Sequence, residues 1–160
     1  LALLGLAKIG QQTYRWWVFA PEREGIVRLE GELEAAALGV VRTQVASDSV
    51  RRAIEALDAE LRDERTRLDL RERSALNLES RGSLSGYYRV LEAYNQRVRH
   101  RNQMFGLWRE SLEENRDFVD RYNAAGDSIR ILADRMGELY YPIRTPAEIA
   151  VSRGWGAPDG

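Results

Sequence analysis

A seven-residue repeat of apolar residues runs through most of this chain and strongly limits the structures that it can form. In the first half, two rows spaced by seven hold 12 apolar residues among 16 positions, with no insertion. The first row is Ile26, Leu33, Val40, Ser47, Ile54, Leu61, Leu68 and Ala75, and the second is Leu29, Ala36, Thr43, Val50, Leu57, Glu64, Arg71 and Leu78. This spacing is typical of the buried seam of a coiled coil.

The repeat begins again after the short polar stretch ESRGSLSG, at residues 79–86. One row is Leu84, Leu91, Val98, Phe105, Leu112, Val119, Gly126, Ala133 and Tyr140, and the other is Tyr87, Tyr94, Arg101, Trp108, Asn115, Tyr122, Ile129 and Met136. The pattern therefore predicts two long helices, over about 22–80 and 84–141. Because the connecting loop is short, the helices must run antiparallel. The predicted fold is all-α: a long antiparallel two-helix coiled-coil hairpin with short N- and C-terminal helices or arms.

The predicted pairing divides the chain into three parts. Residue i lies near residue 162−i to 165−i, so Pro21 and Pro142 fall at the same level and bound the hairpin at its base. Residues 1–20 then form an apolar and aromatic segment before the hairpin at 21–142, and residues 143–160 form a short helix and a docking arm. The first ten residues, LALLGLAKIG, fit either the end of a membrane anchor or a short buried helix.

Polar residues interrupt the predicted seam at a few positions. Arg101 falls within a turn of Glu64, and Asn115 falls within a turn of Ser47. Such polar layers fix the alignment of a seam if their side chains pair, whereas they have no such role if they reach out to water. Gly126 falls opposite the small residue Ala36, and this pairing predicts a close approach of the two backbones.

The half of the hairpin near the chain ends carries more apolar residues than a two-stranded seam requires. This second stripe comprises Ala37, Leu38, Val41 and Val45 on the first helix and Phe118, Ile131, Leu132 and Leu139 on the second. An apolar face wider than the seam indicates that a third element docks there. The sequence offers two occupants: residues 1–19 folding back along the hairpin, or another protein chain.

Aromatic residues gather where the chain enters and leaves the hairpin. They are Tyr14, Trp16, Trp17 and Phe19 on one side, Tyr140 and Tyr141 on the other, and Trp155 in the tail. Trp and Tyr favour the membrane interface, because a flat apolar ring carries one polar group, and they also favour the centres of protein interfaces. The pattern therefore predicts an attachment surface at this end. An aromatic core formed where the two tails cross is the alternative.

The C-terminal tail contains a complete helix-start signal. Thr145 is the predicted N-cap, Pro146 suits the first helical position and Glu148 completes a capping box. Residues 146–152 are therefore predicted to form a short helix that Gly154 ends.

The residue inventory gives no support to an enzyme. The chain has no cysteine and one histidine, His100, so it lacks the ligands of a zinc or iron site, and no catalytic or cofactor-binding motif is present. With a formal net charge of −1, the chain has no overall attraction to nucleic acid. The basic run RVRHR at 97–101 faces Glu60, Asp63 and Glu64 in the predicted pairing, which favours ion pairing between the helices.

One stretch resembles a known family. YNQRVRHRNQMFGLW, at residues 94–108, is similar to the YN…V…RN…W pattern of LemA-like membrane-anchored helical proteins. The similarity spans 15 of 160 residues and implies no activity for this chain.

These features together predict a non-enzymatic accessory subunit. It would dock through its aromatic base on other protein subunits of a membrane complex, with a bacterial respiratory or photosynthetic assembly as one home, and would stabilise or space them. Membrane contact is expected at the N-terminal end, at the bacterial inner membrane, with the side left open and the periplasmic side preferred. Neither nucleic acid nor a cofactor or metal is expected. The alternative is a soluble coiled-coil adaptor that homodimerises into a four-helix bundle.

Overall fold

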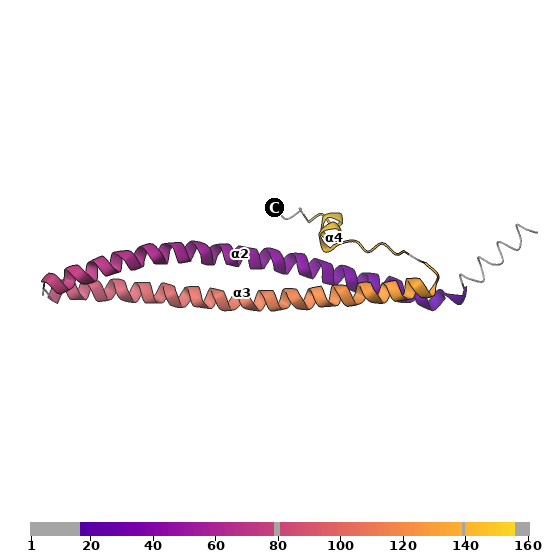
Figure 1. The fold of residues 1–160 in the computed structure, drawn as a ribbon, viewed down its shortest axis with the longest axis horizontal. Coiled ribbons are helices and arrows are strands. Elements are labelled where there is room, and N and C mark those ends of the chain that lie inside the picture. Colours follow the sequence, from indigo (N-terminus) through magenta and orange to yellow (C-terminus); the bar gives the residue numbers. More distant parts are fainter. Residues whose placement is uncertain (1–16, 79–80, 139, 156–160) are drawn as a thin grey trace, which may run out of the picture. The chain divides into compact units, whose positions relative to one another are not determined.

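A computed structural model describes residues 17–138 and 140–155 of the 160-residue chain, apart from residues 79 and 80. For residues 75–78 and 81–83 it describes the backbone but not the side chains. The described chain is all-α. It consists of α2 (Ala20–Leu78), α3 (Arg81–Arg135) and the short α4 (Pro146–Ser152). Helices α2 and α3 pack antiparallel as a hairpin, as the sequence predicts (Figure 1).

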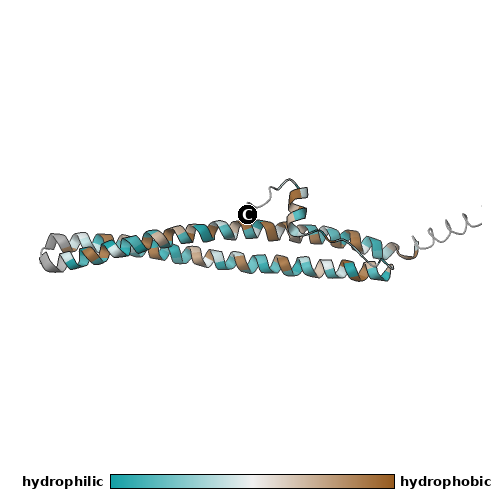
Figure 2. Ribbon diagram, turned by 45° about the horizontal axis from the view of Figure 1, so that its top comes forward, coloured by the Kyte–Doolittle hydropathy of each residue, from teal (hydrophilic) through white to brown (hydrophobic). Residues whose placement is uncertain are grey.

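The chain divides into two compact units. The terminal unit comprises residues 1–42 and 115–160, and the loop unit comprises residues 43–114. Each unit contains a stretch of both long helices, and only the terminal unit contains α4. Hydrophobic and hydrophilic residues alternate along both long helices, as the seven-residue repeat requires (Figure 2).

Burial along α2 confirms the first predicted seam row. Each of its residues from Ile26 to Leu68 is buried, including the polar Ser47. The matching row on α3 is less well covered, because Phe105 and Leu112 in the loop unit stay exposed. A seam between only two helices is open at its sides, so a large side chain is covered over only part of its surface.

Helix α3 ends at Arg135, earlier than the predicted end near residue 141. Gly137 adopts the left-handed backbone conformation, with φ of 78°. The Glu138 N–H donates to the Ala133 carbonyl at 3.0 Å, and the Gly137 N–H donates to the Asp134 carbonyl at 2.9 Å. This pair of hydrogen bonds is a Schellman motif, which ends a helix. Tyr140 consequently lies beyond the helix and not in the seam, which corrects the sequence-based assignment.

The core of the terminal unit joins all three described helices. Its buried members are Ile26, Leu33 and Ala37 of α2, Ala125 and Ile129 of α3, and Ile149 of α4. Tyr141 and Ile143 of the connecting segment pack against it. The C-terminal segment is thus a third element packed on this core, one that the sequence pattern did not indicate. Residues 1–16 lie outside the described residues, and docking of another chain stays a prediction. We call residues 136–155 the C-terminal strap.

Two glycines in the terminal unit make room for large neighbours. A Cβ atom on Gly39 would lie 2.3 Å from a ring carbon of Phe118, so the Phe118 ring packs directly on the backbone of α2. A Cβ atom on Gly126 would lie 3.3 Å from the Ile143 side chain of the strap. Gly126 therefore makes room for the strap, whereas the sequence predicted that it makes room for Ala36.

The two polar interruptions of the α3 seam each find a partner within their own unit. In the terminal unit, Asn115 Nδ2 donates to the Val40 carbonyl at 2.9 Å. In the loop unit, Arg101 donates to both carboxylate oxygens of Asp58, at 2.9 and 3.1 Å. The predicted partner of Arg101, Glu64, is instead paired with Arg97. Arg101 thus forms the predicted ion pair across the seam, but its partner is Asp58 and not Glu64.

Candidate functional site

The C-terminal strap contains a capped helix, α4. The Glu148 N–H donates to Thr145 Oγ1 at 3.3 Å, and the Thr145 N–H donates to Glu148 Oε2 at 2.7 Å. This reciprocal pair, with Pro146 at the start of α4, confirms the predicted capping box. The 7 residues of α4 are too few for a helix to persist alone. Its position therefore depends on Ile149, which is only 1% exposed, and on the buried Ala150.

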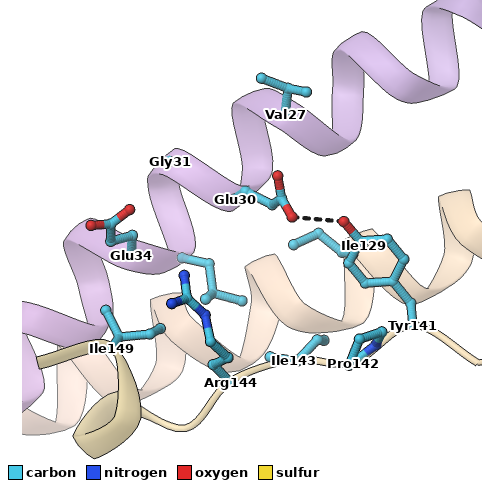
Figure 3. A pocket seen from close by; sticks show the side chains of 11 residues that line it. Val27, Glu30, Gly31, Glu34, Ile129, Tyr141, Pro142, Ile143, Arg144 and Ile149 are labelled. Carbon is cyan, nitrogen blue, oxygen red and sulfur yellow. Dashed lines mark hydrogen bonds between the residues drawn. The ribbon is translucent and has the colours of Figure 1, made fainter. Parts of the chain in front are cut away.

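Polar contacts hold the strap on both long helices. The Tyr122 hydroxyl of α3 donates to the Arg144 carbonyl at 2.9 Å. The Tyr141 hydroxyl of the strap donates to Glu30 Oε1 of α2 at 2.6 Å (Figure 3). Further along, Arg153 forms an ion pair with Glu34 of α2. Because these contacts lie at the surface, each one stabilises the docked strap modestly, and the buried isoleucines contribute more.

A cavity of about 350 Å³ lies between the strap and α2. Most of its lining is apolar or lacks a side chain: Val27, Gly31, Leu33, Ile129, Pro142, Ile143 and Ile149. The polar lining residues are Glu30, Glu34, Tyr141 and Arg144. Figure 3 shows Glu30 and Tyr141 joined across one end of it, and the Arg144 side chain extending from the strap toward α2 beside Ile149. All four polar side chains have a partner in the terminal unit: Glu30 and Tyr141 bond to each other, Glu34 pairs with Arg153, and Arg144 donates to the Ser152 hydroxyl. The cavity is therefore a gap left by imperfect packing between the strap and α2. Its lining contains no nucleophile–base pair.

The contact with Glu30 changes the acidity of Tyr141. Because the phenol donates to a carboxylate, ionisation would place two negative charges side by side, and this raises the pKa of Tyr141 from 10.0 to about 12. At the other end of the strap, the Arg153 guanidinium lowers the pKa of Glu34. The Tyr141–Glu30 contact is therefore lost at high pH, when the phenol ionises. The Arg153–Glu34 contact is lost at low pH, when the carboxylate is protonated.

Alkaline titration tests the Tyr141 contact. A raised folded-state pKa contributes stability that is complete below the unfolded value of 10.0 and is lost as the pH rises through about 12. At pH values below 10, we expect Tyr141→Phe to have a slightly lower thermal midpoint than the unaltered protein. We expect this difference to vanish as the pH approaches 12. Paired thermal melts across this range measure it. A difference that stays constant to the top of the range would show that the hydrogen bond contributes nothing.

The predicted interface residues fall into three groups. Tyr14 and Trp16 lie outside the described residues. Trp17 and Tyr140 are each 80% exposed, and they flank the beginning of α2 and the end of α3, which in an antiparallel hairpin is one end of the terminal unit. Trp155 is 40% exposed at the end of the strap, where its backbone N–H donates to the Ala150 carbonyl at 3.0 Å.

Most of the other predicted interface residues are engaged, wholly or in part, inside the chain. Val41 is buried, and Leu38, Leu132 and Tyr141 pack against the core of the terminal unit. Phe19 and Phe118 are half-buried. The Phe118 ring lies on Gly39, and the guanidinium groups of Arg42 and Arg121 are 5.8 and 5.7 Å from its centroid. Val45 is exposed in the loop unit. An attachment role stays a prediction, and within the terminal unit Trp17, Tyr140 and Trp155 have the free surface for it.

Sequence reasoning did not single out the residues that dock the strap. Ile143 and Ile149 are the apolar side chains of the polar tail that reach the core, and Glu30 and Tyr122 supply its polar contacts. The available signal was the isolated isoleucine in each of the stretches YPIR and AEIA. It gives no indication of which face these residues meet, because the contact is not local in sequence.

The described residues show no other chemical centre. They contain no group of three or more His, Asp or Glu side chains placed to hold a metal ion. None of the described helices is long and apolar enough to cross a membrane. Comparisons with protein-family models, with curated proteins and with solved structures found no match to this chain.

Proposed function

We propose that this chain is a non-enzymatic accessory subunit that attaches through the exposed aromatic residues at one end of its terminal unit. Its partners would be protein subunits of a membrane-associated complex, with the bilayer edge as a further contact and a bacterial respiratory or photosynthetic assembly as one home. The hairpin would then stabilise or space those subunits.

The observation that carries this proposal is the joint exposure of Trp17 and Tyr140. Both side chains are 80% exposed, although each is large and largely apolar. Rings with one polar group are enriched at protein interfaces and at membrane–water boundaries, where one edge can stay hydrated. An exposed pair at one end of the terminal unit therefore favours an attachment point over a self-contained fold.

Figure 1 supports the geometric part of the proposal. The chain enters α2 and leaves α3 at the same end of the terminal unit (Figure 1). Trp17 and Tyr140 stand close to these two points in the sequence, which favours one attachment surface for both. The strap turns back from there and covers the core formed by Ile129 and Ile149. The chain itself thus covers this core of the terminal unit, whereas the aromatic residues Trp17 and Tyr140 stay exposed for a partner.

The test is retention of the full-length protein in the membrane fraction of its own cells. We expect Trp17→Ser combined with Tyr140→Ser to release most of the protein into the supernatant, because both anchors are removed without touching the core. The control is Tyr88→Ser, which removes an aromatic side chain that is also exposed but lies in the loop unit. Equal retention of both variants would contradict attachment at this end.

One observation favours the alternative function, a soluble adaptor that homodimerises into a four-helix bundle. Phe105 and Leu112, which are seven residues apart on one face of α3, are partly exposed in the loop unit. A second hairpin laid against this face would cover them, as two further helices do in a four-helix bundle.

A further inference from the structure

We propose that the loop unit binds a phosphate group in a groove lined by four arginines. The groove has a volume of about 390 Å³. Arginines from both long helices surround it, with Arg67 and Arg71 on α2 and Arg89 and Arg97 on α3. This site lies in a different unit from the proposed aromatic attachment surface, and the inference does not depend on that attachment.

The groove combines an apolar floor with a cationic rim. Leu68, which is buried, and Val90 and Tyr94, which are half-buried, line it beneath the arginines. Ala93 adds a small side chain, which leaves room between the flanking arginines of α3. A ligand that carries a phosphate next to an apolar group matches both parts of this lining.

Three of the neighbouring carboxylates are already engaged. Glu64, the acidic residue of the lining, pairs with Arg97. Nearby, Asp69 pairs with Arg65 and Glu92 pairs with Arg99.

Three arginines of the rim remain without a counter-charge. Among the side chains that the structure describes, Arg67, Arg71 and Arg89 form no ion pair. Arg67 and Arg71 are also four residues apart on one helix, where like charges repel each other. An anion placed between the helices would relieve this repulsion.

The charge count favours phosphate over a carboxylate. Three uncompensated guanidinium groups exceed the single charge of a carboxylate, whereas a phosphate carries up to two charges and three acceptor oxygens. The planar N–H fork of arginine also matches phosphate oxygens in pairs. Two sources supply this chemistry, a free phosphate compound and the headgroup of an anionic lipid.

The experiment compares two triple variants of the full-length protein. Arg67→Gln, Arg71→Gln and Arg89→Gln together remove the unpaired rim. The control, Arg28→Gln, Arg51→Gln and Arg130→Gln, removes the same charge from exposed arginines that have carboxylate partners away from the groove. Glutamine keeps a helix propensity close to that of arginine, so both variants should fold. The probes are inorganic pyrophosphate, followed by calorimetry, and vesicles of phosphatidylcholine with and without phosphatidic acid, followed by flotation.

We expect the rim variant to bind the phosphate probe at least about tenfold more weakly than the unaltered protein, since each charge-assisted hydrogen bond contributes more than a neutral one. The control should bind within about twofold of the unaltered protein. Loss confined to pyrophosphate identifies a free phosphate compound, and loss confined to phosphatidic acid vesicles identifies a lipid headgroup. Absence of binding to either probe, equal loss in both variants, or the same rim dependence with a glutamate-rich peptide and no phosphate would overturn the proposal.

Discussion

Replacing Gly39 by alanine is expected to destabilise the hairpin, although alanine is the better helix former. A Cβ atom at this position would lie 2.3, 2.5 and 2.6 Å from three ring carbons of Phe118. These are atoms of a rigid ring, so the ring or the helix must shift. Overpacking of this kind costs about 1–3 kcal/mol, which offsets the gain of about 1 kcal/mol in helix propensity. Denaturant unfolding followed by circular dichroism measures the change.

Two variants control this result. Gly31 lies on the same helix and has no atom within 4 Å of the position of an added Cβ, so Gly31→Ala should raise the unfolding free energy by up to about 1 kcal/mol. In a Phe118→Ala background, Gly39→Ala should become stabilising by a similar amount, because the clashing ring is absent. A Gly39→Ala variant that is as stable as Gly31→Ala would show that Phe118 does not pack on Gly39.

Replacing Ile149 by aspartate is expected to detach the C-terminal strap and leave the hairpin folded. Ile149 is 1% exposed, and a carboxylate at this place would be buried without a partner. Loss of a buried isoleucine side chain costs about 2–5 kcal/mol, and the surface contacts of Tyr141 and Arg153 are too weak to compensate. Limited proteolysis with trypsin, read by mass spectrometry, measures detachment as cleavage after Arg144.

We expect this cleavage to be at least about tenfold faster in Ile149→Asp, since each 1.4 kcal/mol of lost docking energy raises the open population tenfold. The matched control is Val151→Asp, which introduces the same charge on the same helix at a residue that is 54% exposed. Circular dichroism of both variants should retain the signal of the long helices. Unchanged cleavage in Ile149→Asp would mean that the strap does not depend on this contact.

The long helices were predictable because their pattern is local and repeated many times. Each apolar residue from Ile26 to Leu68 carries the same spacing, so single exceptions such as Ser47 do not obscure the seam. The α4 capping box was predictable for a related reason. Thr145, Pro146 and Glu148 satisfy one another within four residues, and no distant contact is required.

The end of α3 was not predicted, because the apolar repeat continues beyond the helix. Met136 and Tyr140 fit the seven-residue spacing, whereas the backbone stops at Gly137, where a left-handed conformation costs little. The position of Gly137 therefore determined where α3 ends, although the apolar repeat continues beyond it. Reading Gly137 as a helix end would also have placed Tyr140 and Tyr141 in the strap.

Docking of the strap was beyond sequence reasoning for a different reason. The contacts of Ile143 with Gly126 and of Tyr141 with Glu30 join residues far apart in the chain. Their partners follow from the path of the strap after Gly137, and no periodicity encodes that path. The partner of Arg101 was likewise assigned to Glu64, although Asp58 is the carboxylate that it reaches. The alignment of two helices is sensitive to small rotations, which the spacing alone does not fix.

The proposed function requires that this hairpin attaches to a larger membrane-associated assembly. The most direct test is the mass of the native particle after gentle extraction in mild detergent, measured by light scattering on the size-separated protein. The account predicts a particle much heavier than two copies of the chain, from which Trp17→Ser with Tyr140→Ser dissociates the hairpin. A monodisperse homodimer that forms in detergent-free buffer and is unaffected by these substitutions would contradict it and favour the soluble adaptor.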